Sequence, residues 1–190
     1  ATVIAAAAPA WGSARGRVGR ALGQLVYLSG ALPGVLLAFG LMVLALRLAG
    51  PFGGYAALLS SGGLLIAGYS ARFLAEAFGP LRTGVGQLDR RHEESCAVLG
   101  ASHSRWLARI ALPQLRPSIA AAYLVAFIAV LKELPITLLL GGATGLNTMA
   151  FRIWDRYSEA LWHDAGLASL LLVGSALSMT LVTLRWRRHA

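Results

Sequence analysis

Two short stretches decide how this chain is interpreted: ESCAVLG at residues 94–100 and, after a gap of nine residues, IALP at residues 110–113. Both lie in an arginine-rich segment between long apolar runs. A glutamate six residues before a glycine, followed at a fixed distance by Ile-x-Leu-Pro, is a spacing that rarely arises by chance. The segment is therefore the first in which we look for a function.

The same segment predicts two short helices joined near Gly100. Asp89 can cap the first helix, which is expected to run to about Leu99, and Gly100 can adopt the left-handed conformation that ends a helix. Ser102 can cap the second helix, and Pro113 is expected to stop it. Apolar side chains share one face of the second helix: Trp106, Leu107, Ile110 and Leu112. A bent pair with an apolar ridge suits docking into a groove on another protein, and an amphipathic loop on the lipid surface is the alternative.

The composition is that of an integral membrane protein. Hydrophobic residues make up 57% of the 190 residues, charged residues make up 13%, and the mean hydropathy is +0.65. A soluble domain usually carries about 25% charged residues. The single cysteine, Cys96, excludes an intrachain disulfide and argues against a cysteine-based metal site.

Four apolar runs are each long enough to cross the roughly 30 Å hydrocarbon layer as a helix. They cover residues 25–48, 55–78, 119–140 and 165–184. The opening apolar stretch at 1–11 is too short to span, and the chain does not begin with methionine, so we expect it to be truncated at its N-terminus. Pro33 and Pro135 are expected to kink their helices.

The basic residues predict the orientation of these runs. Sixteen of the seventeen are arginine, and most lie between or after the apolar runs. Segments 12–20, 79–117 and 185–190 then share one side of the membrane, which arginine-rich loops mark as cytoplasmic. Segments 49–54 and 141–164 lie outside, and the C-terminus is cytoplasmic. This distribution argues against nucleic-acid binding despite a pI near 11.0.

Two ionisable residues interrupt the third apolar run. Lys132 and Glu133 lie past its middle, and ionisable residues in such a run usually have a function because their burial is costly. Adjacent helical residues point about 100° apart, so the two cannot simply pair with each other. The candidates to line a translocation pathway are Lys132, Glu133, Pro135 and Thr137. The alternative is that the two charges only hold helices together.

A short amphipathic helix is expected at residues 148–162, with Asn147 or Thr148 as its cap. The spacing would allow ion pairs from Arg152 to Asp155 and from Arg156 to Glu159. In the second apolar run Arg72 and Glu76 lie one turn apart. We expect them to pair with each other or with lipid headgroups.

The stretches at 94–100 and 110–113 resemble the loop by which the membrane subunit of a bacterial ABC importer contacts its ATPase. That loop has the pattern Glu-Ala-Ala-x-x-x-Gly-x9-Ile-x-Leu-Pro, and this chain has Ser95 and Cys96 in place of the two alanines. KELPITLLL at residues 132–140 and LNTMAFRI at 146–153 resemble the iron(III)-type branch of these permeases. The likeness extends from about residue 20 to the end of the chain.

The resemblance implies an all-α polytopic transmembrane bundle, a single permease domain over 1–190 that forms part of a six-helix type I importer unit in the bacterial inner membrane. It assigns ATPase coupling to five residues: Glu94, Gly100, Ile110, Leu112 and Pro113. It implies an ABC ATPase dimer that binds ATP and Mg, a periplasmic binding protein, and a second permease unit, either as a homodimer or as a fused half. The implied substrate is ferric iron.

Several alternatives stay open or are excluded by the residues. The only lysine is Lys132, so a nucleotide-binding P-loop with its Gly-Lys-Ser/Thr cannot exist here and no cofactor is expected on this chain. The four histidines are scattered, so we expect no metal site. Within the family, thiamine, polyamine or sulfate are alternative substrates. A secondary transporter would leave the 94–113 spacing unexplained, and a membrane enzyme would need clustered catalytic groups that the sequence lacks.

Overall fold

The computed structural model describes residues 1–190 with the exception of 16, 50–53, 55, 56, 58–61, 101, 142–144, 147 and 190. The elements of this described part are all helical, which confirms the all-α fold class. In chain order they are α1 (Thr2–Arg15), α2 (Arg17–Ala31), α3 (Gly34–Ala49), α5 (Gly63–Arg72), α6 (Leu74–Gly86), α7 (Arg90–Val98), α8 (His103–Trp106), the π-helical turn η2 (Leu107–Ala111), α9 (Leu112–Leu131), α10 (Pro135–Leu140), α11 (Met149–Ser158) and α12 (Trp162–His189).

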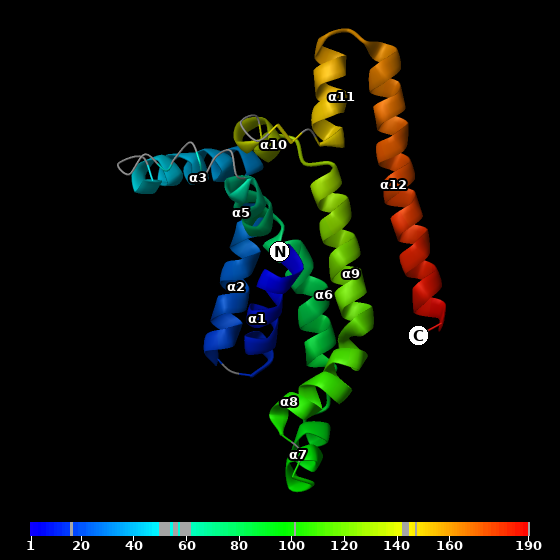
Figure 1. Ribbon diagram of the computed structural model, residues 1–190. Helices are drawn as coiled ribbons and strands as arrows, with labels where there is room; N and C mark the ends of the chain where they lie inside the picture. Colours follow the sequence, from blue (N-terminus) through cyan, green and yellow to red (C-terminus); the bar gives the residue numbers. More distant parts are fainter. Residues whose placement is uncertain are drawn as a thin grey trace.

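Helices α1, α2, α6 and α9 form the main bundle, and α12 runs alongside α9 (Figure 1). Small and aromatic side chains fill the bundle centre, among them Ala77, Phe78 and Ala122, each fully buried. Helices α6 and α9 pass so closely that a Cβ built on Gly84 would lie 2.2 Å from Ser118 Oγ. A second core lies where α3, α5 and α10 meet, around the fully buried Ile136 and Leu140. The fold therefore has two packed regions, one along the bundle and one at its end.

The first predicted span, residues 25–48, is not one crossing helix. It is divided between α2 and α3, whose axes are bent by 104° at the break between Ala31 and Gly34. Pro33 lacks the N–H that a continuous helix would need and disfavours helical geometry at the preceding Leu32. The kink expected at Pro33 is thus a complete change of direction, and α3 lies across the bundle (Figure 1).

The second and third predicted spans also differ from the structure. Part of 55–78 lies outside the described residues, and the rest is divided between α5 and α6 at Phe73, with α6 continuing to Gly86. The third run begins much earlier than residue 119, because the helix is continuous from His103 to Leu131, and it ends before the predicted 140. Lys132 and Glu133 lie in the break that follows, and α10 is a separate short helix.

Pro113 does not end the second short helix, contrary to the sequence prediction. It lies in the first turn of α9, directly after the π-helical turn. A π turn changes the hydrogen-bond register, and proline is tolerated in a first helical turn because its missing N–H has no partner to lose there. The helix therefore continues through the proline into the membrane-spanning segment.

The fourth run, residues 165–184, lies within the single long helix α12. Within the described part, two helices are long and apolar enough to cross a membrane on their own, His103–Leu131 and Trp162–Arg185. Helix α11 packs against the start of α12 as an antiparallel hairpin. Thr148 caps α11, since its Oγ1 accepts from the Phe151 N–H at 3.2 Å, whereas Asn147 lies outside the described residues.

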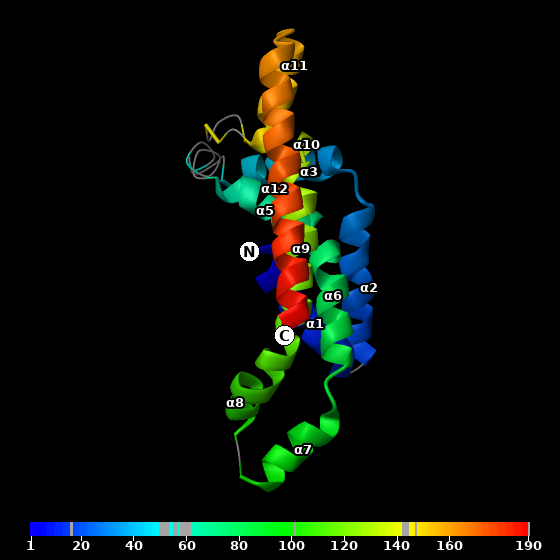
Figure 2. The ribbon, with the colours of Figure 1, turned by 90° about the vertical axis from the view of Figure 1, so that its right-hand side faces the viewer.

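The arginine-rich segments gather at one end of the molecule. Helices α7 and α8 project beyond the bundle at the end toward which the C-terminus of α12 points, whereas α11 lies at the opposite end (Figures 1 and 2). The alternation expected from the arginines thus matches the arrangement of these segments along the bundle.

Candidate functional site

The projecting pair α7–α8 is built as its sequence predicts at two points. The Arg91 N–H donates to Asp89 Oδ1 at 2.9 Å, so Asp89 caps α7. Gly100 has φ of +74°, a left-handed conformation that is unfavourable for residues with a Cβ. Ser102 is at the N-cap position of α8, but its hydroxyl contacts Ser104 Oγ at 3.1 Å instead of a backbone N–H. Two local signals therefore set the bend of the pair.

The tip of this pair exposes apolar side chains. Val98 is 88% exposed and Leu99 is 84% exposed, and Glu94 on the same helix is also exposed. A large apolar side chain with almost no protein contact, at the extremity of a projecting segment, is typical of a surface that a partner covers. Sequence reasoning did not single out Val98 and Leu99, although their position just before Gly100 was a usable signal.

The apolar ridge predicted on the second helix is wrong in its most prominent member. Trp106 is only 4% exposed and packs its ring edge-on against Trp11 of α1, with centroids 5.8 Å apart. Leu107 is half-buried, and Leu112 is 45% exposed. Because α8 is continuous with α9, its apolar side faces the end of the bundle. These apolar side chains therefore attach the projecting pair to the bundle. The exposed apolar side chains are those at the end of α7.

The five predicted coupling residues consequently fall into two groups. Glu94 and Gly100 lie on the outer part of the projection, whereas Ile110, Leu112 and Pro113 lie at its base, in η2 and the first turn of α9. His103 Nδ1 lies 3.1 Å from Glu93 Oε1 and so links α8 to α7 across the bend. The outer group thus lies on the exposed part of the projection, and the inner group lies where the projection joins α9.

The predicted pathway residues lie at the opposite end of α9, where the helix breaks. Lys132 is exposed, and Glu133 is half-buried with Oε1 accepting from the Ile136 N–H at 3.4 Å. Thr137 is 1% exposed, and its hydroxyl donates to the Glu133 carbonyl at 3.3 Å. Pro135 begins α10. Among the residues that the structure describes, neither Lys132 nor Glu133 forms an ion pair. Whether they line a pathway or hold helices together stays a prediction.

Close contacts, most of them polar, connect the three places where helices break near Glu133. These are the breaks between α2 and α3, between α5 and α6, and between α9 and α10. A Cβ built on Gly34, at the start of α3, would lie 2.7 Å from Glu133 Oε1, so only glycine allows this approach. The Tyr69 hydroxyl of α5 forms a hydrogen bond with Thr137 Oγ1. Arg72 Nη1 donates to the Gly30 carbonyl at 3.2 Å, which satisfies an acceptor that the end of α2 leaves free. We call this set the polar belt, formed by Gly30, Gly34, Tyr69, Arg72, Glu133 and Thr137.

Tyr69 is a member of the belt that sequence reasoning missed as a functional candidate. Its signal in the sequence was the stretch Tyr69-x-x-Arg72-Phe73-Leu74, which resembles the iron(III)-type branch but was given no role. Arg72 also lies 3.6 Å from Glu76 Oε1, as the spacing predicted. The belt therefore connects the second apolar run to the pathway candidates on the third.

Comparison with known proteins identifies the family. Residues 2–189 match the model of the family described as the binding-protein-dependent transport system inner membrane component. The chain belongs to this family. A similar protein is the Fe(3+)-transport system permease protein FbpB 2 of Haemophilus influenzae, 29% identical over 150 residues, which are 79% of this chain and 28% of that protein. The chain thus spans between a quarter and a third of the length of the curated relative it matches.

As an inner membrane component of a transport system, the chain has a role in transport rather than in catalysis, and the resemblance seen in the sequence is confirmed at the level of the family. Its long helices carry exposed apolar side chains suited to lipid or to neighbouring subunits, such as Leu170 on α12 at 71% exposure. Within the described residues, no group of three or more histidine, cysteine, aspartate or glutamate side chains could hold a metal ion.

Proposed function

We propose that this chain is a permease unit of an ATP-driven ABC importer whose substrate arrives on a periplasmic binding protein. The family match supports the class. The observation that carries the proposal is the projecting pair α7–α8, whose exposed apolar tip lies beyond the end of the bundle (Figure 2). Such a tip on a bent helical pair fits a groove on a soluble partner.

The partner in this proposal is an ATPase dimer that binds ATP and Mg. Val98, Leu99 and Glu94 would contact it, and Ile110 with Pro113 would transmit the contact to α9. The arginines around this end favour a cytoplasmic position for α7–α8 and for the C-terminus. A second permease unit, either another copy or a fused half, completes the pore.

The proposed substrate is ferric iron, which the name of the Haemophilus influenzae relative supports. Ferric iron is a hard cation and favours oxygen ligands. The polar belt contributes the carboxylate of Glu133 and the hydroxyls of Tyr69 and Thr137 at the helix breaks. In this proposal Lys132, Glu133, Pro135 and Thr137 border the pathway, and selection of the substrate rests with the binding protein.

Leu99→Asp tests the docking role. A charge at an 84% exposed tip leaves the fold of the bundle intact but prevents burial in an apolar groove. We expect the variant to reach the membrane normally while losing co-purification of the ATPase, and Ser158→Asp on the far end of the molecule serves as the control. Wild-type co-purification of Leu99→Asp would rule out docking through this tip.

The substrate is tested with the complete transporter in vesicles. Ferric iron on its binding protein should stimulate ATP hydrolysis and enter the vesicles, whereas thiamine, polyamines and sulfate should do neither. If thiamine, a polyamine or sulfate stimulated ATP hydrolysis instead, that compound would be the substrate in place of iron. The docking proposal would be unaffected.

A further inference from the structure

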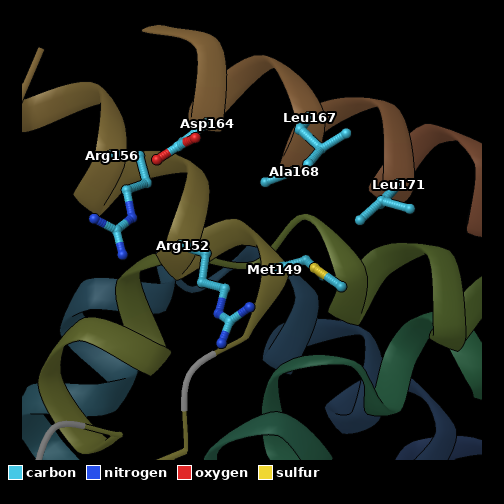
Figure 3. Close-up of a pocket in the computed structure, with 7 residues that line it drawn as sticks. All are labelled: Met149, Arg152, Arg156, Asp164, Leu167, Ala168 and Leu171. Atoms are coloured by element: carbon cyan, nitrogen blue, oxygen red, sulfur yellow. The ribbon is translucent and has the colours of Figure 1, made fainter. Parts of the chain in front are cut away.

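The α11–α12 hairpin lines an open-sided cavity of about 270 Å³ that none of the roles above uses. Its lining residues are Met149, Arg152, Arg156, Asp164, Leu167, Ala168 and Leu171. Since one water occupies about 30 Å³ of liquid, the volume suits a molecular group rather than a single ion. Figure 3 shows Asp164 opposite Arg156 at one end of the cavity and Leu171 with Met149 at the other. The cavity is therefore polar at one end and apolar at the other.

The depth of the cavity coincides with the edge of the bilayer. Helix α12 can cross the membrane within Trp162–Arg185. Twenty residues back from Arg185 correspond to about 30 Å, the thickness of the hydrocarbon layer, which places the boundary near Ala165. Exposed Trp154, Tyr157 and Trp162 surround this level, as aromatic side chains do at membrane interfaces. The polar end of the cavity thus lies at the headgroup level and the apolar end lies among the acyl chains.

The charges of the cavity are unevenly compensated. Arg156 Nη1 lies 3.4 Å from Glu159 Oε2, so its charge is already paired. Arg152 and Asp164 form no ion pair within the described part of the chain, either with each other or with another residue. Arg152 is exposed on the α11 wall of the cavity, and at the boundary of the hydrocarbon layer a cation without a counter-ion is unfavourable. The cavity accordingly presents one uncompensated cation and one uncompensated anion on opposite walls.

We propose that this cavity binds a zwitterionic phospholipid whose headgroup carries a phosphate and a primary ammonium. Arg152 contacts the phosphate and Asp164 contacts the ammonium. The part of an acyl chain nearest the headgroup lies along Leu167, Leu171 and Met149. An anionic lipid without the ammonium fits less well, because Asp164 would face a headgroup that offers it no cation. Free phosphate would leave the apolar end empty.

Native mass spectrometry of the purified full transporter, extracted from vesicles of defined composition, tests the proposal. With equal parts of phosphatidylethanolamine and phosphatidylglycerol, the wild type should retain phosphatidylethanolamine preferentially. Arg152→Gln should weaken retention of this lipid by about tenfold, the effect of losing one charge-assisted contact. Asp164→Asn should shift the preference toward phosphatidylglycerol, because it removes only the group that selects the ammonium.

Asp155→Asn is the matched control, since Asp155 lies on α11 without lining the cavity. If Arg152→Gln fails to assemble, Asp164→Asn alone tests the proposal, through its predicted shift in lipid preference toward phosphatidylglycerol. Wild-type preference for phosphatidylglycerol, or equal retention in Arg152→Gln and Asp155→Asn, would overturn the proposal. Loss of binding-protein affinity in Arg152→Gln with lipid retention unchanged would also overturn it and would show that a protein occupies this surface.

Discussion

At the scale of single residues, the most informative group is the carboxylate of Glu133. The sequence predicted that a charge in the third apolar run has a function, because such a charge is costly without one. It did not predict that Gly34 would lie against the carboxylate, or that Tyr69 would bond to Thr137. These contacts join segments far apart in the chain, so no local pattern encodes them.

Glu133→Gln separates a role in the pathway from a structural one. Since the carboxylate has no ion-pair partner among the described residues, the amide should leave assembly unchanged. We expect iron uptake per assembled complex to fall by about tenfold, the effect of roughly 1.4 kcal/mol of lost cation stabilisation. Reconstituted uptake and complex yield are the measurements.

Glu76→Gln provides the contrast for that experiment. It removes a carboxylate that lies 3.6 Å from Arg72 Nη1. This variant should lower the yield of assembled complex and leave uptake per complex near the wild-type value. If Glu133→Gln instead behaves like Glu76→Gln, the carboxylate is structural.

At the scale of elements, two helix-end signals were correct, whereas the predicted cap at Ser102 and the predicted stop at Pro113 were not. Asp89 and Gly100 act through neighbours in the sequence, and both behave as predicted. Pro113 was expected to stop a helix, but the π turn before it lets the helix continue. The buried side of α8 likewise depends on Trp11, which is distant in the sequence. The prediction of an exposed apolar ridge was wrong because the exposure of these side chains depends on packing against α1, which the local sequence does not show.

Gly100→Val is expected to distort the bend between α7 and α8. A β-branched residue at φ of +74° is strained, at a cost of about 1–3 kcal/mol, so the tip should be displaced while the bundle persists. Co-purification of the ATPase and stimulated ATP hydrolysis should both fall. Gly100→Asn is the control because asparagine tolerates the left-handed region better, and equal losses in both variants would contradict a conformational cause.

Gly84→Val is expected to separate α6 from α9. The added side chain would meet Ser118 and Leu115, and overpacking of this kind costs about 1–3 kcal/mol. Gly79→Val lies on the same helix, and a Cβ there meets nothing within 4 Å. The thermal midpoint of the solubilised protein should fall clearly further for Gly84→Val, and equal midpoints would show that helix propensity, not packing, explains the change.

At the scale of the whole molecule, the distribution of arginine predicted which segments share an end. The number and bounds of the spans were harder to predict, because apolar length does not distinguish one straight helix from two that meet at an angle. The 104° bend after Ala31 is the clearest case. Hydropathy treats residues 25–48 as continuous, although proline chemistry divides them.

Cysteine labelling tests the orientation of the molecule in the membrane. Native Cys96 lies on α7, and Ser158 lies at the far end on α11. In intact cells an impermeant thiol reagent should label Ser158→Cys in a Cys96→Ala background. Native Cys96 should react only after permeabilisation, and its labelling in sealed cells would reverse the orientation.

The unbroken helix from His103 to Leu131 has a mechanical consequence. Its 29 residues extend for about 43 Å at roughly 1.5 Å per residue. One end is joined to α7 through the Glu93–His103 contact, and the other ends at Lys132 and Glu133. The helix is in effect a lever arm, and a tilt of about 5° at its base displaces its far end by about 4 Å. A small movement of the exposed end of the projecting pair is therefore enough to change the distances between the oxygen atoms of the polar belt at the other end.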